Sequence, residues 1–177
     1  MKIILISGKA SSGKTKLGEY IVKCAINNGL RAIQTEYSKY LKLYAKEILG
    51  YDGSRENKPR KFLQDLGSFI RYDLGDEHFF TRRMLEDFSV YETLADIVVI
   101  SDVRLIKEIE DIKNSHYKNV VTIKIKNYHS EYELTEEEKN HITERELEDY
   151  DKFDYIIENK SLVDLDNFAK KILEGEI

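Results

Sequence analysis

The sequence contains few residues of several types, and each scarcity excludes some classes of protein. Its 177 residues include one cysteine, Cys24, and one proline, Pro59. A single cysteine excludes an internal disulfide framework and is typical of a reducing compartment. No apolar run approaches the ~20 residues of a membrane span, and the opening "MKIILIS" is too soon followed by glycine to indicate a signal peptide. We therefore expect a soluble cytoplasmic protein with no membrane partner.

Positive charge is not in excess either. The chain has 28 lysine and arginine residues against 33 aspartate and glutamate residues, a formal net charge of −5 at pH 7. A polyanion binder usually has a basic surplus, so we expect no nucleic-acid partner. Hydrophobic residues make up 41% of the chain, which favours one folded domain over residues 1–177 rather than a disordered chain. The oligomeric state stays open, a homodimer included.

What the sequence does have is the octapeptide "GKASSGKT", residues 8–15, directly after the apolar run "IILIS". It matches the pattern G-x-x-x-x-G-K-[ST] of the phosphate-binding loop. Apolar positions from Leu17 to Ala25 then recur at helical spacing. Strand, glycine-rich loop and helix in this order is the context that supports a nucleotide site. The alternative is a tight turn between strand and helix with no ligand.

The residue types of the loop suit a bound triphosphate. Gly8 and Gly13 let backbone N–H groups turn inward around phosphate oxygens, and the helix N-terminus adds its positive end. Lys14 would reach the β- and γ-phosphates of ATP, while Thr15 would coordinate Mg²⁺. The residues expected to bind ATP are Gly8, Lys9, Ala10, Ser11, Ser12, Gly13, Lys14 and Thr15.

The rest of the chain alternates between short apolar runs and helical patterns. Four more strands are expected, at 31–36, 96–101, 119–125 and 154–158. This alternation predicts an α/β fold of three layers, the P-loop NTPase fold, with a five-stranded parallel sheet. Two connections exceed what one crossover helix needs.

The first of these long connections, at about 37–95, would be a helical insertion with helices near 38–49, 59–74 and 76–91. The second, at about 128–153, would be another insertion. Both leave the carboxyl edge of the sheet, where ligands bind in such folds.

The second helix of the insertion has a polar stripe. Arg60, Gln64, Gly67 and Arg71 fall at i, i+4, i+7 and i+11 and therefore share one side of the helix. Two guanidinium groups would grip a phosphate, the amide would read a base or sugar, and the glycine would leave room for a ligand. The alternative is a solvated charged face, which is what such stripes usually are.

The third expected strand ends in "VVISDVR". Asp102 would emerge at its carboxyl end, where a carboxylate can hold Mg²⁺, and Arg104 would bridge the donor and acceptor phosphates. Alternatively, Asp102 would be the N-cap of the next helix. After the fifth strand, Asn159 would border the base of the donor nucleotide.

With these residues in place, the chain resembles the deoxynucleoside monophosphate kinases of phages and bacteria, P-loop kinases of the adenylate-kinase superfamily. The resemblance rests on "SGKASSGKT", "KPRKFLQDLGSFIR", "ISDVRLIKEIEDIK" and "HITERELEDYDKFDYIIENKSLVDL", in that order. It implies ATP-dependent phosphorylation of a nucleoside monophosphate, with the insertion at 37–95 binding the acceptor through Arg71 and Gln64, together with Arg104, and with the segment at 128–153 as a lid. In that lid His141 and Arg145 would bind the substrate, with Arg145 within reach of the transferred phosphate when the segment closes, although better-known lids are richer in arginine.

The nature of the acceptor decides the chemistry. A monophosphate is largely dianionic at neutral pH because its second pKa is about 6, so no general base is needed. Catalysis then consists of alignment and charge neutralisation, for which Lys14, Asp102 and Arg104 are the candidates. One alternative is a kinase of a small-molecule hydroxyl, of the nucleoside or dephospho-coenzyme type, with Glu36 as its base. Another is a nucleotide-binding regulator without turnover.

Overall fold

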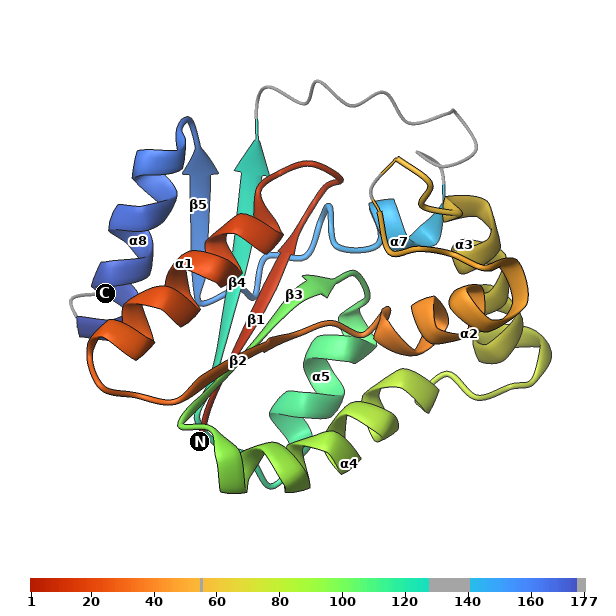
Figure 1. Cartoon of the computed structure of the whole chain (residues 1–177), viewed down its shortest axis with the longest axis horizontal. Helices are drawn as coiled ribbons and strands as arrows, with labels where there is room; N and C mark the ends of the chain where they lie inside the picture. The colour runs from red at the N-terminus through yellow and green to blue at the C-terminus, as the bar shows by residue number, and fades with distance from the viewer. Residues whose placement is uncertain (55, 128–140, 175–177) are drawn as a thin grey trace.

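The structure is a computed structural model that describes residues 1–54, 56–127 and 141–174. Within them lies a sheet of five strands in the order β2-β3-β1-β4-β5 (Figure 1). All neighbouring strands are parallel, so the predicted sheet is confirmed. The strands are β1 (Lys2–Gly8), β2 (Ala32–Thr35), β3 (Ile97–Val103), β4 (Val120–Asn127) and β5 (Tyr155–Asn159).

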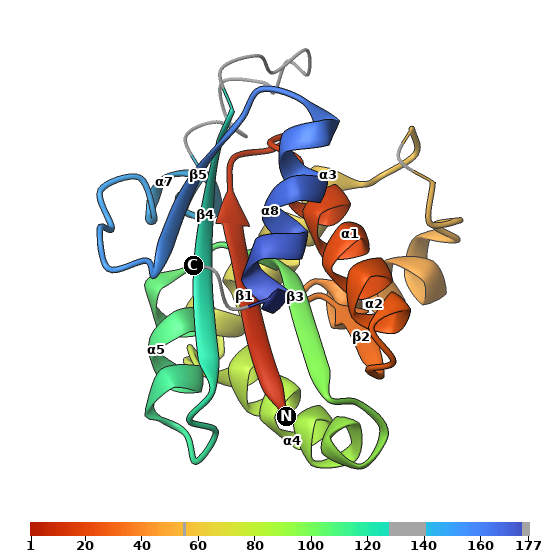
Figure 2. The ribbon, with the colours of Figure 1, turned by 90° about the vertical axis from the view of Figure 1, so that its left-hand side faces the viewer.

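Helices cover both faces of the sheet (Figure 2). On one face lie α1 (Lys14–Asn27) and α8 (Leu162–Glu174), and on the other α4 (Phe79–Leu94) and α5 (Ile106–Asn114). Successive side chains of β1 point to opposite faces, so Ile3 packs with α4 and α5 while Ile4 packs with α1 and α8. Both faces of this central strand are therefore buried, which explains its continuous apolar sequence.

The three helices expected between β2 and β3 are present as α2 (Lys39–Leu49), α3 (Arg60–Ser68) and α4. The second differs from its prediction, because the α-helix stops at Ser68 and continues as a π-helical turn, η1 (Phe69–Asp73). The N–H of Leu74 closes this turn by donating to the carbonyl of Phe69 at 2.9 Å. Such turns re-aim the side chains that follow and recur at functional sites.

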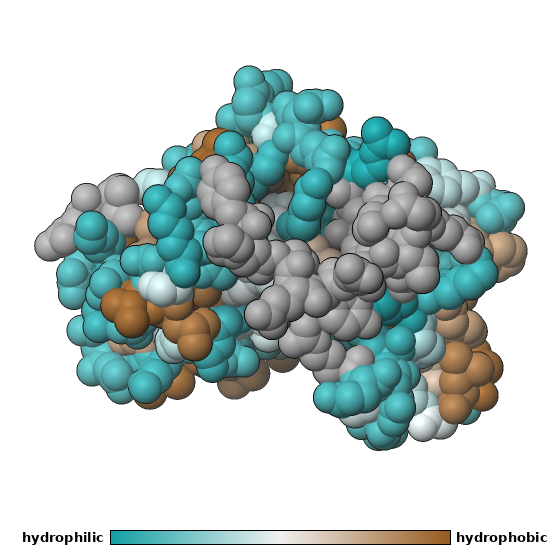
Figure 3. Space-filling model, turned by 90° about the horizontal axis from the view of Figure 1, so that it is seen from above, coloured by the Kyte–Doolittle hydropathy of each residue, from teal (hydrophilic) through white to brown (hydrophobic). Residues whose placement is uncertain are grey.

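Part of the predicted lid-like segment, residues 128–140, lies outside the described residues. The chain returns at the short helix α7 (Ile142–Arg145), which lies at the carboxyl end of the sheet near α3 (Figure 1). Seen from above that end, the described side chains are mostly hydrophilic (Figure 3). In the part of the chain that the structure describes, every helix is too short or too polar to cross a membrane.

Candidate active site

The phosphate loop joins β1 to α1 with an unusual backbone. The φ angles of Gly8 and Gly13 are 153° and 96°. A Cβ on Gly8 would lie 2.7 Å from the carbonyl oxygen of Ile125, and one on Gly13 would lie 2.7 Å from the amide nitrogen of Asn159. Both positions therefore need glycine. Ser11 also has a positive φ, 59°, a strained conformation that gathers at functional sites.

The inside of the loop is equipped to hold phosphate. The Lys14 ammonium is buried and donates to the carbonyls of Gly8 and Lys9, each at 2.6 Å. Among the described residues, the Ser12 hydroxyl is buried without a hydrogen-bond partner. Buried polar groups are nearly always paired, so a phosphate oxygen is the partner that the loop lacks. The loop therefore fits a bound triphosphate.

Two side chains hold the loop from the sheet. The Asn159 amide at the end of β5 donates to the Ser12 carbonyl at 2.9 Å, so it supports the loop backbone; its contact with a donor base stays a prediction. The Gln34 amide donates to the Thr15 carbonyl at 3.1 Å and to the Ser101 hydroxyl at 3.0 Å. Sequence reasoning missed Gln34, because nothing in the short run "RAIQTE" distinguishes it.

A cavity of about 680 Å³ opens beside the loop. It brings together the loop, the polar stripe of α3 and η1, and the end of β3, which argues against a solvated stripe. Predicted site residues that line it are Ala10, Ser11, Ser12, Gly13, Lys14, Thr15, Arg60, Gln64, Arg71, Asp102 and Arg104. Gly8 and Lys9 line a neighbouring cavity of about 460 Å³, which shares Arg104 with the first.

Cationic groups gather in the part of the larger cavity lined by α3 and η1, which we predict to be its acceptor half. Lys42 and Lys58 line it beside Arg60 and Arg71. Burial lowers the pKa of the Lys58 ammonium, and the charges of Lys42 and Arg60 lower it further. Converging positive charges attract an anionic ligand. Sequence reasoning missed Lys42 and Lys58, although the run "KPRK" was a signal for the second.

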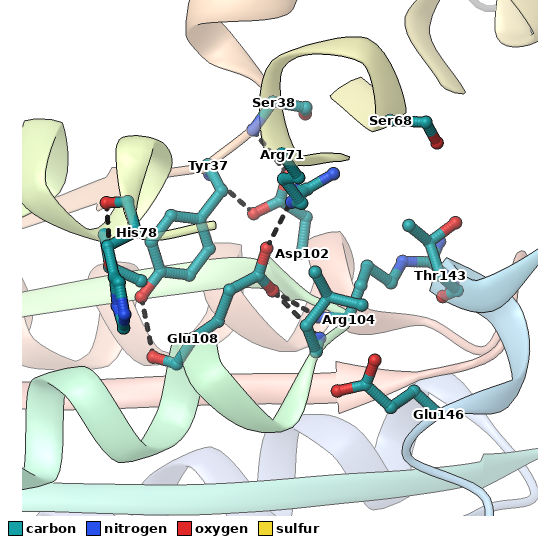
Figure 4. A network of polar contacts seen from close by, with 12 residues as sticks. Tyr37, Ser38, Ser68, Arg71, His78, Asp102, Arg104, Glu108, Thr143 and Glu146 are labelled. Atoms are coloured by element: carbon teal, nitrogen blue, oxygen red, sulfur yellow. Dashed lines mark hydrogen bonds and ion pairs between the residues drawn. The ribbon is translucent and has the colours of Figure 1, made fainter. Parts of the chain in front are cut away.

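Asp102 ties the end of β3 to the start of α2 (Figure 4). Its two carboxylate oxygens accept from the backbone N–H groups of Tyr37 at 2.7 Å and Ser38 at 2.9 Å. The alternative in which Asp102 caps the next helix is wrong, because α5 starts at Ile106 and the Glu108 carboxylate accepts from the Leu105 N–H at 3.1 Å. That glutamate, at the third position of the helix, accepts from the N-cap N–H as the glutamate of a capping box does, although the Leu105 side chain has no polar atom to return the bond.

A magnesium site would need Asp102 and Thr15, which line the same cavity. No group of three or more acidic, histidine or cysteine side chains is placed to hold a metal within residues 1–54, 56–127 and 141–174. Mg²⁺ is usually bound through one or two carboxylates and substrate phosphates rather than by an all-protein cage. One carboxylate and one hydroxyl beside a phosphate loop fit that pattern.

The Arg71 guanidinium has three neighbours that fix its position. Its carbon lies 4.5 Å from the centre of the Phe80 ring, and Nη2 lies 3.4 Å from Oε1 of Glu108. A Cβ added to Gly67 would lie 3.0 Å from Nη1. We expected Gly67 to leave room for a ligand. The structure shows instead that the space beside Gly67 holds the Arg71 guanidinium. The side chain is 9% exposed.

Replacing Gly67 with alanine is expected to raise the KM for the phosphoryl acceptor, by roughly tenfold if about 1.4 kcal/mol of binding is lost. The added methyl group would push the Arg71 guanidinium out of position, while Lys14 and the phosphate loop are untouched. We therefore expect kcat and the KM for ATP to stay close to wild type in steady-state assays. Asp65→Ala, on the exposed side of the same helix, is the control. An unchanged acceptor KM in Gly67→Ala would contradict the role given to this gap.

The residues predicted in the lid lie at the rim. A ring nitrogen of His141 lies 3.1 Å from the Ser68 hydroxyl, and the other accepts from the Thr143 N–H at 3.3 Å. His141 thus caps α7 and contacts the end of α3. Arg104 donates to the Thr143 carbonyl at 3.5 Å. Arg145 is exposed and, like His141, does not line either cavity.

Kinases are among the solved structures with a similar fold. Shikimate kinase from Aquifex aeolicus matches with a TM-score of 0.52 and 16% identity, over 99% of this chain and 98% of that chain. A gluconokinase from Sinorhizobium meliloti 1021 matches with a TM-score of 0.49 and 13% identity, over 99% of this chain and 93% of that chain. Identities this low show the fold alone. No curated protein matches the sequence.

The parallel sheet, its phosphate loop and the adjoining cationic cavity define a P-loop kinase. The chain belongs to the deoxynucleotide monophosphate kinase family, whose model matches residues 35–172. This match begins after the phosphate loop at 8–15, so the loop and the family are two independent observations. The protein is therefore a phosphotransferase that uses ATP.

Proposed function

We propose that this kinase transfers the γ-phosphoryl group of ATP to a 2′-deoxynucleoside 5′-monophosphate and forms the diphosphate. The observation that carries the proposal is the shared cavity, which Arg71 and Arg60 of the insertion line together with the phosphate loop. An acceptor that is itself an anion requires positive charge on its own side of the site. The family match supports a deoxynucleotide as that acceptor.

The chain's own residues would do three things. Lys14 would exchange its bonds to the Gly8 and Lys9 carbonyls for bonds to the phosphates of ATP and neutralise the charge that develops during transfer. Arg71 and Arg104 would hold the acceptor phosphate in line with the transferred group. A bound Mg²⁺, held by Thr15 and Asp102, would supply further charge neutralisation between the phosphates. The acceptor dianion needs no base.

The arrangement around Glu36 also favours a phosphate acceptor over a hydroxyl. The Glu36 carboxylate lines the cavity, but it accepts from the Lys42 ammonium at 2.5 Å and from the Ser38 hydroxyl at 3.3 Å. A hydroxyl acceptor would have to compete with both of these contacts to reach the carboxylate.

The test is ADP formation from Mg·ATP with each of the ribo- and deoxyribonucleoside monophosphates in turn. We expect one or a few deoxynucleoside monophosphates to stimulate ADP formation, and Lys14→Ala to abolish it. Stimulation by nucleosides or other alcohols instead, lost in Glu36→Gln, would support a hydroxyl kinase and contradict the proposal. Binding without turnover would indicate a regulator, and a ligand at a hundred times its Kd stabilises the fold by about 2.7 kcal/mol, visible as a thermal shift.

A further inference from the structure

Glu108 is a buried carboxylate in the wall of the acceptor half of the cavity. Its side chain is 5% exposed, and its Oε1 faces Nη2 of Arg71 at 3.4 Å. Its Oε2 accepts from the backbone N–H groups of Arg104 at 2.7 Å and Leu105 at 3.1 Å (Figure 4). One carboxylate thus contacts both residues that would hold the acceptor phosphate, through the side chain of Arg71 and the backbone of Arg104.

Helix capping alone does not account for this placement. Capping the start of a helix needs only an acceptor for its free N–H groups, and glutamine serves there as well as glutamate. Here the carboxylate is buried, and burial raises its pKa to about 7 although Arg71 and the N–H groups act in the opposite direction. Burying an acid is unfavourable, which a cap on the protein surface would avoid.

Among the described residues, Arg71 supplies the cationic side chain that contacts Glu108. Asp102, at the end of β3, is a like charge that raises the pKa of Glu108. The Tyr37 hydroxyl donates to the backbone carbonyl of Glu108 at 2.9 Å, and burial raises the pKa of that hydroxyl, which keeps it neutral. Glu146 turns its carboxylate to the Ile106 N–H at 2.7 Å.

We propose that Glu108 is a positioning residue for the phosphoryl acceptor: it holds the Arg71 guanidinium against Phe80 and Gly67, aimed into the cavity. The proposal rests on the proposed function, because it concerns an acceptor that binds through Arg71. The side chain does not touch the reacting atoms. Its effect on acceptor binding must therefore depend on the presence of Arg71, and this dependence can be measured.

The test is a double-mutant cycle with Glu108→Gln and Arg71→Ala. Glutamine keeps an acceptor for the Arg104 and Leu105 N–H groups and removes the charge. We expect Glu108→Gln to raise the acceptor KM about tenfold in the wild-type background and less than about twofold in the Arg71→Ala background, because residues acting through one contact are not additive. The KM for ATP should change in neither. Glu110→Gln, exposed on the same helix, is the matched control.

The acceptor in this cycle is whichever of dAMP, dCMP, dGMP and dTMP gives the fastest ADP formation with wild type. An equal rise in KM in both backgrounds, or no rise in either, would overturn the proposal. Should Glu108→Gln lack a cooperative unfolding transition, Glu108→Asp replaces it, with the charge one methylene farther from Arg71 and the same loss of effect expected without Arg71. If none of the four monophosphates stimulates ADP formation, the proposed function and this inference are both overturned. If one does, but the effects of the two substitutions on the acceptor KM are additive, the inference alone is overturned.

Discussion

Lys14→Ala is expected to lower kcat for phosphoryl transfer by about a thousandfold or more, the scale on which a single phosphate-binding cation acts in such enzymes. The ammonium group is buried at the N-terminus of α1 and is aimed at the inside of the phosphate loop by the carbonyls of Gly8 and Lys9. Alanine would leave the loop without its mobile positive charge. Neutral donors of the loop backbone would remain, so ATP binding should weaken less than turnover.

The measurement is initial velocity of ADP formation at saturating ATP and acceptor, together with thermal unfolding of the same samples. Lys23→Ala, exposed on the same helix, controls for the loss of a lysine from α1. We expect the melting temperatures of both variants to lie close to wild type. A Lys14→Ala enzyme that keeps a tenth or more of wild-type kcat would rule out the role assigned to this lysine.

Asp102→Asn is expected to lower kcat by at least about a hundredfold, because even residues that only support a metal ligand contribute up to about that factor, and also to destabilise the fold. Both carboxylate oxygens accept backbone N–H groups, from Tyr37 and Ser38. The carbonyl oxygen of an asparagine would keep one of these bonds, while its NH₂ group would point a donor at the second backbone N–H. Hydrogen bonds to a charged group contribute about 1.5–3 kcal/mol each, so a loss of about 2 kcal/mol is expected.

Magnesium dependence separates the two effects of this substitution. If Asp102 holds the metal, the Mg²⁺ concentration for half-maximal activity should rise in Asp102→Asn, whereas damage to the Tyr37–Ser38 turn alone would lower kcat without moving it. Asp65→Asn, exposed on α3, is the control. An unchanged magnesium requirement would remove Asp102 from the metal site and leave it a structural role.

Much of the fold was predictable because its signals are local. A strand buried on both faces must be apolar throughout, and the runs at 96–101 and 119–125 show this directly. Two helix ends also carry local signals: Gly50 closes α2 with a φ of 70°, and the Ser161 hydroxyl accepts from the Asp164 N–H at 3.2 Å at the start of α8. In each case the residues that carry the signal are neighbours in the chain.

The contacts that complete the site were not predictable, because they join distant parts of the chain. Gln34 of β2 contacts Ser101 of the neighbouring strand β3, 67 residues further along the chain, and Asp102 contacts Tyr37. Glu108 could be read from the sequence only as a helix residue, since its partner Arg71 belongs to another element. The π-helical turn at Phe69–Asp73 was also missed, because apolar spacing does not distinguish it from a continuing α-helix.

The confinement of Arg71 has a consequence for the entropy of binding. A free arginine side chain loses about 2 kcal/mol of rotamer freedom when it is fixed, and a flexible site loses that free energy each time a ligand binds. Here Phe80, Gly67 and Glu108 restrict the guanidinium in the folded protein itself. The entropy of the Arg71 side chain is therefore lost during folding and not again on binding, so the acceptor phosphate binds to a guanidinium that is already in position.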